Sequence, residues 1–264
     1  MNITKQETHS EVQTTPTREI LSKVPEVTLI FWIIKILATT LGETGGDALS
    51  MSMNLGYLVS TGIFAVIFLA AVIIQVKAKR FHPFRYWITI IATTTVGTTM
   101  ADFADRSLHI GYAGGSTILL TLLLASLFVW YRTMGSIAVD TVNSPKTEMF
   151  YWVTIMFSQT LGTALGDWTA DSAGLGYSGG ALVFGALLVI VAIAYFRTKI
   201  SRTALFWTAF ILTRPLGAVV GDFLDKPISK GGLDCSRYTA SGILVVLIIT
   251  LIVIFWPKAA QKAH

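Results

Sequence analysis

Long apolar segments alternate with apolar segments that also carry polar residues along most of the chain. Four runs lack charge and reach or approach the roughly 20 residues needed to cross a bilayer: 55–76, 116–131, 181–196 and 241–256. The four others contain Gly, Thr and acidic residues: about 27–50, 84–105, 149–170 and 205–224. This pattern predicts an all-α membrane protein with eight transmembrane helices in one domain, residues 27–257.

The polar segments share one order of residues. In each, a Trp is followed by a Gly ten residues later and by an Asp five residues after that Gly. The four sets are Trp32, Gly42 and Asp47; Trp87, Gly97 and Asp102; Trp152, Gly162 and Asp167; and Trp207, Gly217 and Asp222. A fixed pattern of this kind indicates one two-helix unit copied in series, here with repeats at about 27–80, 81–140, 145–200 and 201–257.

Each unit crosses the membrane twice, so all four copies take the same orientation. This predicts parallel repeats around a pseudo-symmetry axis along the membrane normal. In its Trp, Gly and Asp spacings the sequence resembles the bacterial membrane proteins with four tandem two-helix repeats known as domain of unknown function 347. The resemblance covers about residues 27–257 and implies a bacterial inner-membrane protein. It implies no particular chemistry.

Composition and charge agree with a bilayer environment. Hydrophobic residues make up 53% of the chain and charged residues 13%. The net charge of +5 does not indicate a nucleic-acid partner. Most basic residues lie after the second predicted helix of each repeat and at the chain ends. By the positive-inside rule, this distribution predicts that both termini are cytoplasmic.

Other features narrow the function class. Residues 1–26 are rich in Thr and Glu and are predicted to form a disordered cytoplasmic tail, with a second tail at 258–264. Cys235 is the single cysteine, which excludes an internal disulfide and a thiolate cluster. The sequence has no nucleophile elbow, phosphate loop or zinc helix motif, so we expect neither an enzyme nor a bound cofactor.

Each polar segment carries a stripe of polar residues about four positions apart, which share one helix face. The candidate ion-binding residues on these stripes are Thr39, Glu43 and Asp47; Thr94, Thr98, Asp102 and Asp105; Gln159, Thr163, Asp167 and Asp171; and Asp222 and Asp225. Lys35 and Arg214 are predicted to act as internal counter-charges. The small residues Gly42, Gly97, Gly162 and Gly217 are predicted to allow close helix packing.

The repeated aspartates are the strongest candidates for function. A carboxylate at the centre of a membrane costs about 2.5–3.5 kcal/mol, so each should face protein or water and have a partner. Each lies fifteen residues past a Trp expected at the cytoplasmic interface, or about 22 Å along the helix. We therefore expect a cavity in the outer half of the membrane that opens outward as a vestibule.

Oxygen ligands of this kind favour hard divalent cations. The leading hypothesis is a secondary transporter of a hard divalent cation, with manganese or magnesium preferred, that is coupled to protons. Its metal ligands would be Asp47, Asp102, Asp167, Asp222 and Glu43. One alternative is a proton-coupled transporter of a small organic solute that Arg214 and Lys35 bind; another is a non-transporting membrane scaffold or sensor. The sequence leaves the oligomeric state open.

Overall fold

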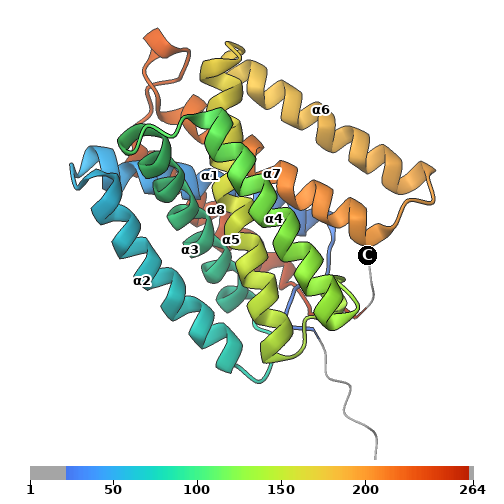
Figure 1. Cartoon of the computed structure of the whole chain (residues 1–264). Helices are drawn as coiled ribbons and strands as arrows, with labels where there is room; N and C mark the ends of the chain where they lie inside the picture. Colours follow the sequence, from blue (N-terminus) through green and yellow to red (C-terminus); the bar gives the residue numbers. More distant parts are fainter. Residues whose placement is uncertain (1–21, 262–264) are drawn as a thin grey trace, which may run out of the picture.

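The computed structural model describes residues 22–261, and the regular structure within them is helical apart from one isolated bridge between Pro25 and Ala259 (Figure 1). The first helices of the four repeats are α1 (Leu29–Asp47), α3 (Pro83–Asp102), α5 (Pro145–Asp167) and α7 (Arg202–Asp225). The second helices are α2 (Gly56–Lys77), α4 (Tyr112–Met134), α6 (Gly176–Arg197) and α8 (Arg237–Phe255). The predicted all-α architecture is confirmed.

Six of these helices are long and apolar enough to cross a membrane: α1 with its continuation to Ser52, α2, α4, α6, α7 and α8. The chain is therefore a multi-pass membrane protein. The remaining two, α3 and α5, are rich in threonine and have most of their side chains buried against neighbouring helices. Their polar content follows from this interior position.

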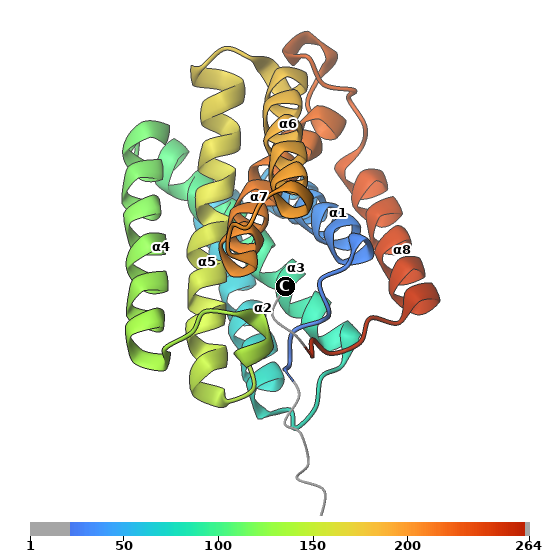
Figure 2. The same cartoon turned by 90° about the vertical axis from the view of Figure 1, so that its right-hand side faces the viewer.

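The odd helices form a closed ring. In it α1 packs against α3, α3 against α5, α5 against α7, and α7 against α1 (Figures 1 and 2). Each even helix packs outside the ring on the odd helix of the following repeat: α2 on α3, α4 on α5, α6 on α7, and α8 on α1. The two helices of one repeat touch each other far less, so each repeat depends on its neighbours for burial.

The even helices carry the apolar outer surface. Val66 of α2 is 68% exposed, Leu182 of α6 is 75% exposed and Val246 of α8 is 62% exposed. An apolar surface of this extent is typical of a face that contacts lipid. The ring of odd helices lies inside them, with most of its side chains buried.

Three of the odd helices end in a change of helical geometry. Directly after Asp47, Asp102 and Asp167 the chain continues as five-residue π-helical turns, Ala48–Ser52, Phe103–Ser107 and Trp168–Ser172. In the fourth repeat α7 runs on to Asp225 instead and is followed by a short 3₁₀ turn, Ile228–Lys230. Single π-helical turns are frequent at functional sites.

Both described chain ends lie at the end of the ring where the even helices finish. The backbone N–H of Lys23 donates to Val142 O over 2.9 Å, and that of Ala260 donates to Val24 O over 2.8 Å. The Lys23 ammonium also donates to Val76 O at the end of α2, over 3.0 Å. Residues 22–25 are buried, so the tail predicted for residues 1–26 does not extend over them; residues 1–21 and 262–264 lie outside the described residues.

Candidate ion-binding site

Side chains four residues apart on the odd helices form five successive layers inside the ring. Each layer has one side chain from every repeat. The layers are Phe31, Tyr86, Tyr151 and Phe206 (the aromatic layer); Lys35, Ile90, Ile155 and Phe210; Thr39, Thr94, Gln159 and Arg214; Glu43, Thr98, Thr163 and Ala218; and Asp47, Asp102, Asp167 and Asp222 (the aspartate layer). All of these side chains are buried. The last three layers therefore form a polar column inside the ring, and the first two layers are mainly apolar or aromatic.

Four glycines allow the ring to close this tightly. Gly42 faces Thr94, Gly97 faces Gln159, Gly162 faces Arg214 and Gly217 faces Thr39, always from one repeat to the next. A Cβ at Gly97 would lie 3.0 Å from the backbone N of Thr160, and one at Gly217 would lie 2.9 Å from the backbone carbonyl carbon of Thr39. Backbone atoms cannot move aside as a side chain can, so these contacts require glycine.

The aspartate layer is paired with cations from the connections that follow the odd helices. The Lys226 ammonium forms an ion pair with Asp47 and lies 2.9 Å from Asp222 and 3.8 Å from Asp225. Burial opposes its charge, but the three carboxylates outweigh burial and raise the pKa of Lys226 above its ordinary value. Lys226 is therefore held by ion pairs to carboxylates of the first and fourth repeats.

Arg106 has the same role on the other side of the layer. Its guanidinium lies 2.8 Å from Asp102 and 3.5 Å from Asp167. Arg237, the first residue of α8, lies 2.7 Å from Asp225. The sequence did not single out Lys226 or Arg237 as partners of the aspartates. The spacing Asp102–Arg106, four residues apart like Asp222–Lys226, was the signal that could have identified two of the three cations.

Carboxylates nevertheless outnumber cations in this cluster. Five buried carboxylates face three cationic groups: Asp47, Asp102, Asp167, Asp222 and Asp225 against Lys226, Arg106 and Arg237. Two sets of three acidic groups have ligand oxygens within 4.8 Å of one another: Glu43, Asp47 and Asp102; and Asp47, Asp222 and Asp225. With all five carboxylates ionised, the cluster has an excess of two negative charges, which equals the charge of a divalent cation.

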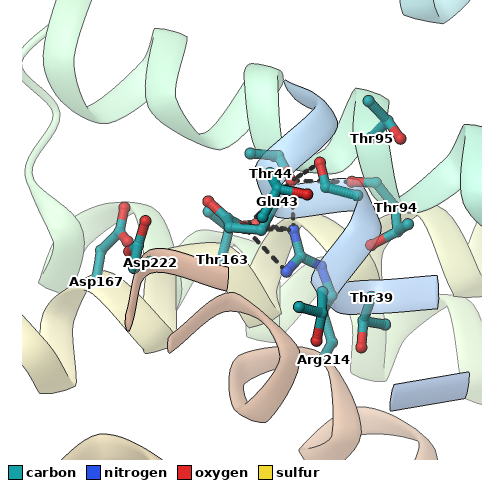
Figure 3. A network of polar contacts seen from close by, with 12 residues as sticks. Thr39, Glu43, Thr44, Thr94, Thr95, Thr163, Asp167, Arg214 and Asp222 are labelled. Atoms are coloured by element: carbon teal, nitrogen blue, oxygen red, sulfur yellow. Dashed lines mark hydrogen bonds and ion pairs between the residues drawn. The ribbon is translucent and has the colours of Figure 1, made fainter. Parts of the chain in front are cut away.

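Arg214 points toward Glu43 and Thr163, which lie on two other helices of the ring, as Figure 3 shows. Two of its guanidinium nitrogens donate to Glu43 Oε2, each over 3.1 Å. One of them also donates to Thr98 Oγ1 over 2.6 Å and to Thr163 Oγ1 over 2.5 Å. These three partners come from α1, α3 and α5, so a single side chain of α7 connects all four repeats.

The repeats are also identified by comparison with known proteins. The family model described as Repeat of Unknown Function (DUF347) matches residues 30–81, 85–136, 150–201 and 205–259. The chain belongs to this family. The comparisons with curated proteins and with solved structures each find no match. The family assignment confirms the resemblance seen in the Trp, Gly and Asp spacings.

Lys35 differs from its predicted role in this DUF347 protein. Within the part of the chain that the structure describes, its ammonium has no hydrogen-bond partner, and it lies 4.1 Å from the centre of the Phe210 ring. It is therefore not paired with an acidic residue, whereas Arg214 is paired with Glu43. In the next layer, the Thr94 hydroxyl and the Gln159 amide also have no hydrogen-bond partner among the described residues.

Two other predicted ligands lie outside the aspartate layer. Asp105 is half-buried beside Gly115, and Asp171 is exposed, with the Tyr112 hydroxyl 3.5 Å away. Counting in steps of about four residues assumed that α-helical geometry continues past Asp102 and Asp167. Both stretches are π-helical turns, whose hydrogen bonds span five residues. Asp105 and Asp171 therefore do not share the helix face that carries Asp102 and Asp167.

The access predicted for the site also differs. The four residues of the aspartate layer are only 1–3% exposed, so they do not line an open outward vestibule. At the other end of the column the aromatic layer closes the ring, where the hydroxyls of Tyr86 and Tyr151 lie 2.6 Å apart. Thr39 is engaged in helix contact, since its hydroxyl donates to Ile36 O and to Thr213 O. The column is closed at both ends.

Proposed function

We propose that this DUF347 protein is a secondary transporter of a hard divalent cation, with manganese or magnesium preferred, and that the aspartate layer binds the ion. The observation that carries the proposal is the excess of two carboxylates over cationic groups in a buried cluster. Buried carboxylates in excess of their cationic partners are costly in a membrane, and carboxylates at this depth mark ion pathways in many transporters. Oxygen ligands of this kind suit magnesium and manganese.

The proposed arrangement in the membrane has eight crossings around an axis along the membrane normal. Both chain ends lie in the cytoplasm of a bacterium, and the protein lies in the inner membrane. The aspartate layer is then in the outer half of the bilayer and the aromatic layer near the cytoplasmic side. The support is the closed ring of α1, α3, α5 and α7, in which each repeat makes the same contacts with the next.

Lys226 and Arg106 explain how such a site stays stable without its ion. Both cations sit among the aspartates, and both belong to connections outside the odd helices. A divalent ion balances the two excess carboxylates while Lys226, Arg106 and Arg237 stay paired with the others. If protons bind the carboxylates when the divalent ion leaves, the charge of the cluster stays balanced during transport.

Movement of the ion past Arg214 requires the ring to open. Pro215 follows Arg214 inside α7 and removes a backbone N–H from the helix, which weakens α7 at that level. Glu43 belongs both to the Arg214 ion pair and to one of the carboxylate sets. Metal binding by Glu43 would therefore compete with Arg214 and loosen the contact that joins the four repeats.

Flux of manganese into vesicles that contain the purified protein tests the proposal. The Asp102→Asn and Asp167→Asn variants should lose most of the flux, because each removes a charged ligand from the aspartate layer. Asp171→Asn is the matched control, since Asp171 is exposed and lies outside the layer. Absence of divalent flux in the native protein, or flux unchanged by both variants, contradicts the proposal.

A second candidate rests on Lys35, whose ammonium has no partner among the described residues. In that function Lys35 and Arg214 bind the carboxylate of a small organic solute and the aspartates carry protons. Competition separates the two: organic anions would protect the protein against thermal unfolding in this case, and divalent metals in the first. A protein that responds to neither and shows no flux would favour a membrane scaffold or sensor.

A further inference from the structure

A groove on the outside of the ring lies apart from the polar column. It has a volume of about 360 Å³ and is formed by α1, α6 and α7. Its walls are mainly apolar and include Trp32, Ile36, Leu188, Val191 and Ala209. The exposed side chains of Leu29 and Phe196 also line it, so the groove opens onto the lipid-facing surface.

The mouth of the groove has a different chemistry from its walls. Val27, Thr28 and Leu29 line it where α1 begins, and Arg202 lines it where α7 begins. The first turn of a helix carries N–H groups without intrahelical partners and a partial positive charge. Two helix N-termini, the C-terminal end of α6 and one exposed arginine therefore meet at one end of an apolar groove, where Arg202 donates a hydrogen bond to the Tyr195 carbonyl.

Basic residues of the α6–α7 connection add to this charge. Arg197 and Lys199 are exposed a few residues before Arg202. The guanidinium of Arg202 lies over the Tyr195 ring, with its carbon 4.1 Å from the ring centre, which fixes the arginine beside the groove. Among the described residues, no acidic side chain lines the groove.

We infer that this groove binds an anionic phospholipid, with its phosphate at Arg202 and the start of α1 and one acyl chain along the apolar walls. Basic pockets between membrane helices on the cytoplasmic side are suited to anionic headgroups. The combination of a cationic mouth and an apolar wall matches both parts of such a lipid. The groove follows the seam between α1 and α7, where the first and last repeats meet.

Lipid retention tests the inference without reference to transport. The full-length protein in detergent is incubated with equal amounts of phosphatidylglycerol and phosphatidylcholine, washed, and analysed by native mass spectrometry. We expect one tightly held phosphatidylglycerol per chain and little phosphatidylcholine. Arg202→Glu should reduce retention about tenfold or more, because it replaces an attractive charge by a repulsive one.

The matched control is Arg132→Glu. Arg132 is also an exposed arginine over an aromatic ring, 5.9 Å from the centre of Phe128, but it does not line the groove. A second variant, Ala192→Trp, fills the groove from α6 and should also abolish retention while thermal unfolding stays unchanged. Equal retention of the two lipids, or equal losses in Arg202→Glu and Arg132→Glu, overturns the inference.

Discussion

Replacement of Arg214 by methionine should be among the most destabilising substitutions in the protein. The arginine is fully buried, and it supplies the only cation within ion-pair distance of Glu43 among the described residues. Methionine is apolar and of similar length, so it leaves little cavity but removes four hydrogen bonds to the ring. The main effect is a buried carboxylate without its partner.

The magnitude follows from that carboxylate. Removal of one partner of a buried ion pair costs about 3–5 kcal/mol. Thr98 adds little to this cost, because its hydroxyl still has Gly42 O and Thr94 O as acceptors, each at 3.2 Å. For a protein of this size the loss corresponds to a fall of roughly 10 °C in the midpoint of thermal unfolding.

Thermal unfolding in detergent, followed by tryptophan fluorescence, measures this effect. The double variant Glu43→Gln with Arg214→Met removes both charges, so it should recover about 2 kcal/mol relative to Arg214→Met alone. Arg132→Met, at an exposed arginine, serves as the control and should change stability by less than about 0.5 kcal/mol. A midpoint for Arg214→Met equal to that of the control would refute the view that Arg214 holds the ring together.

Three further substitutions test other parts of the structure by the same measurement. Gly217→Ala should cost about 1–3 kcal/mol through overpacking against backbone, whereas Gly62→Ala, at an open helical position, should be neutral or stabilising. Tyr86→Phe should cost about 1–3 kcal/mol because the Tyr151 hydroxyl loses its buried partner, and a variant with both hydroxyls removed should be less affected. Lys226→Met should lower stability without divalent cations and regain it with manganese; a loss that manganese does not reverse contradicts binding at the aspartate layer.

The repeat, and the alignment of the four odd helices with one another, were predictable because both follow from the residue spacing. A Trp, a Gly and an Asp at fixed offsets place equivalent residues at equivalent heights on four helices. Steps of four residues then identify which side chains share a face, and Glu43, Thr98 and Thr163 do meet around one point, the Arg214 guanidinium. The α-helical period is sufficient for this because it holds from the Trp to the Asp of each repeat.

The partners of the aspartates were predictable only in part: four-residue spacing indicates the pairs Asp102–Arg106 and Asp222–Lys226, but not the contacts of these cations with other repeats. Lys226 and Arg106 lie beyond the regular part of the odd helices, where α-helical geometry has ended. Their directions depend on the π-helical turn in the second repeat and on its absence in the fourth. The spacing also does not predict that each even helix packs on the following repeat. An even helix packed on the odd helix of its own repeat would give the same pattern of residues.

That pairing has a consequence for the order of the repeats. Each two-helix unit docks onto the next, and the last docks onto the first, so contacts between repeats hold the ring together. Pro25 and Ala259 are bridged across the two chain ends, which lie side by side. A circular permutant that begins at the α2–α3 connection and joins the old ends by a short linker should therefore assemble into the same ring, as should two separately expressed halves of the chain.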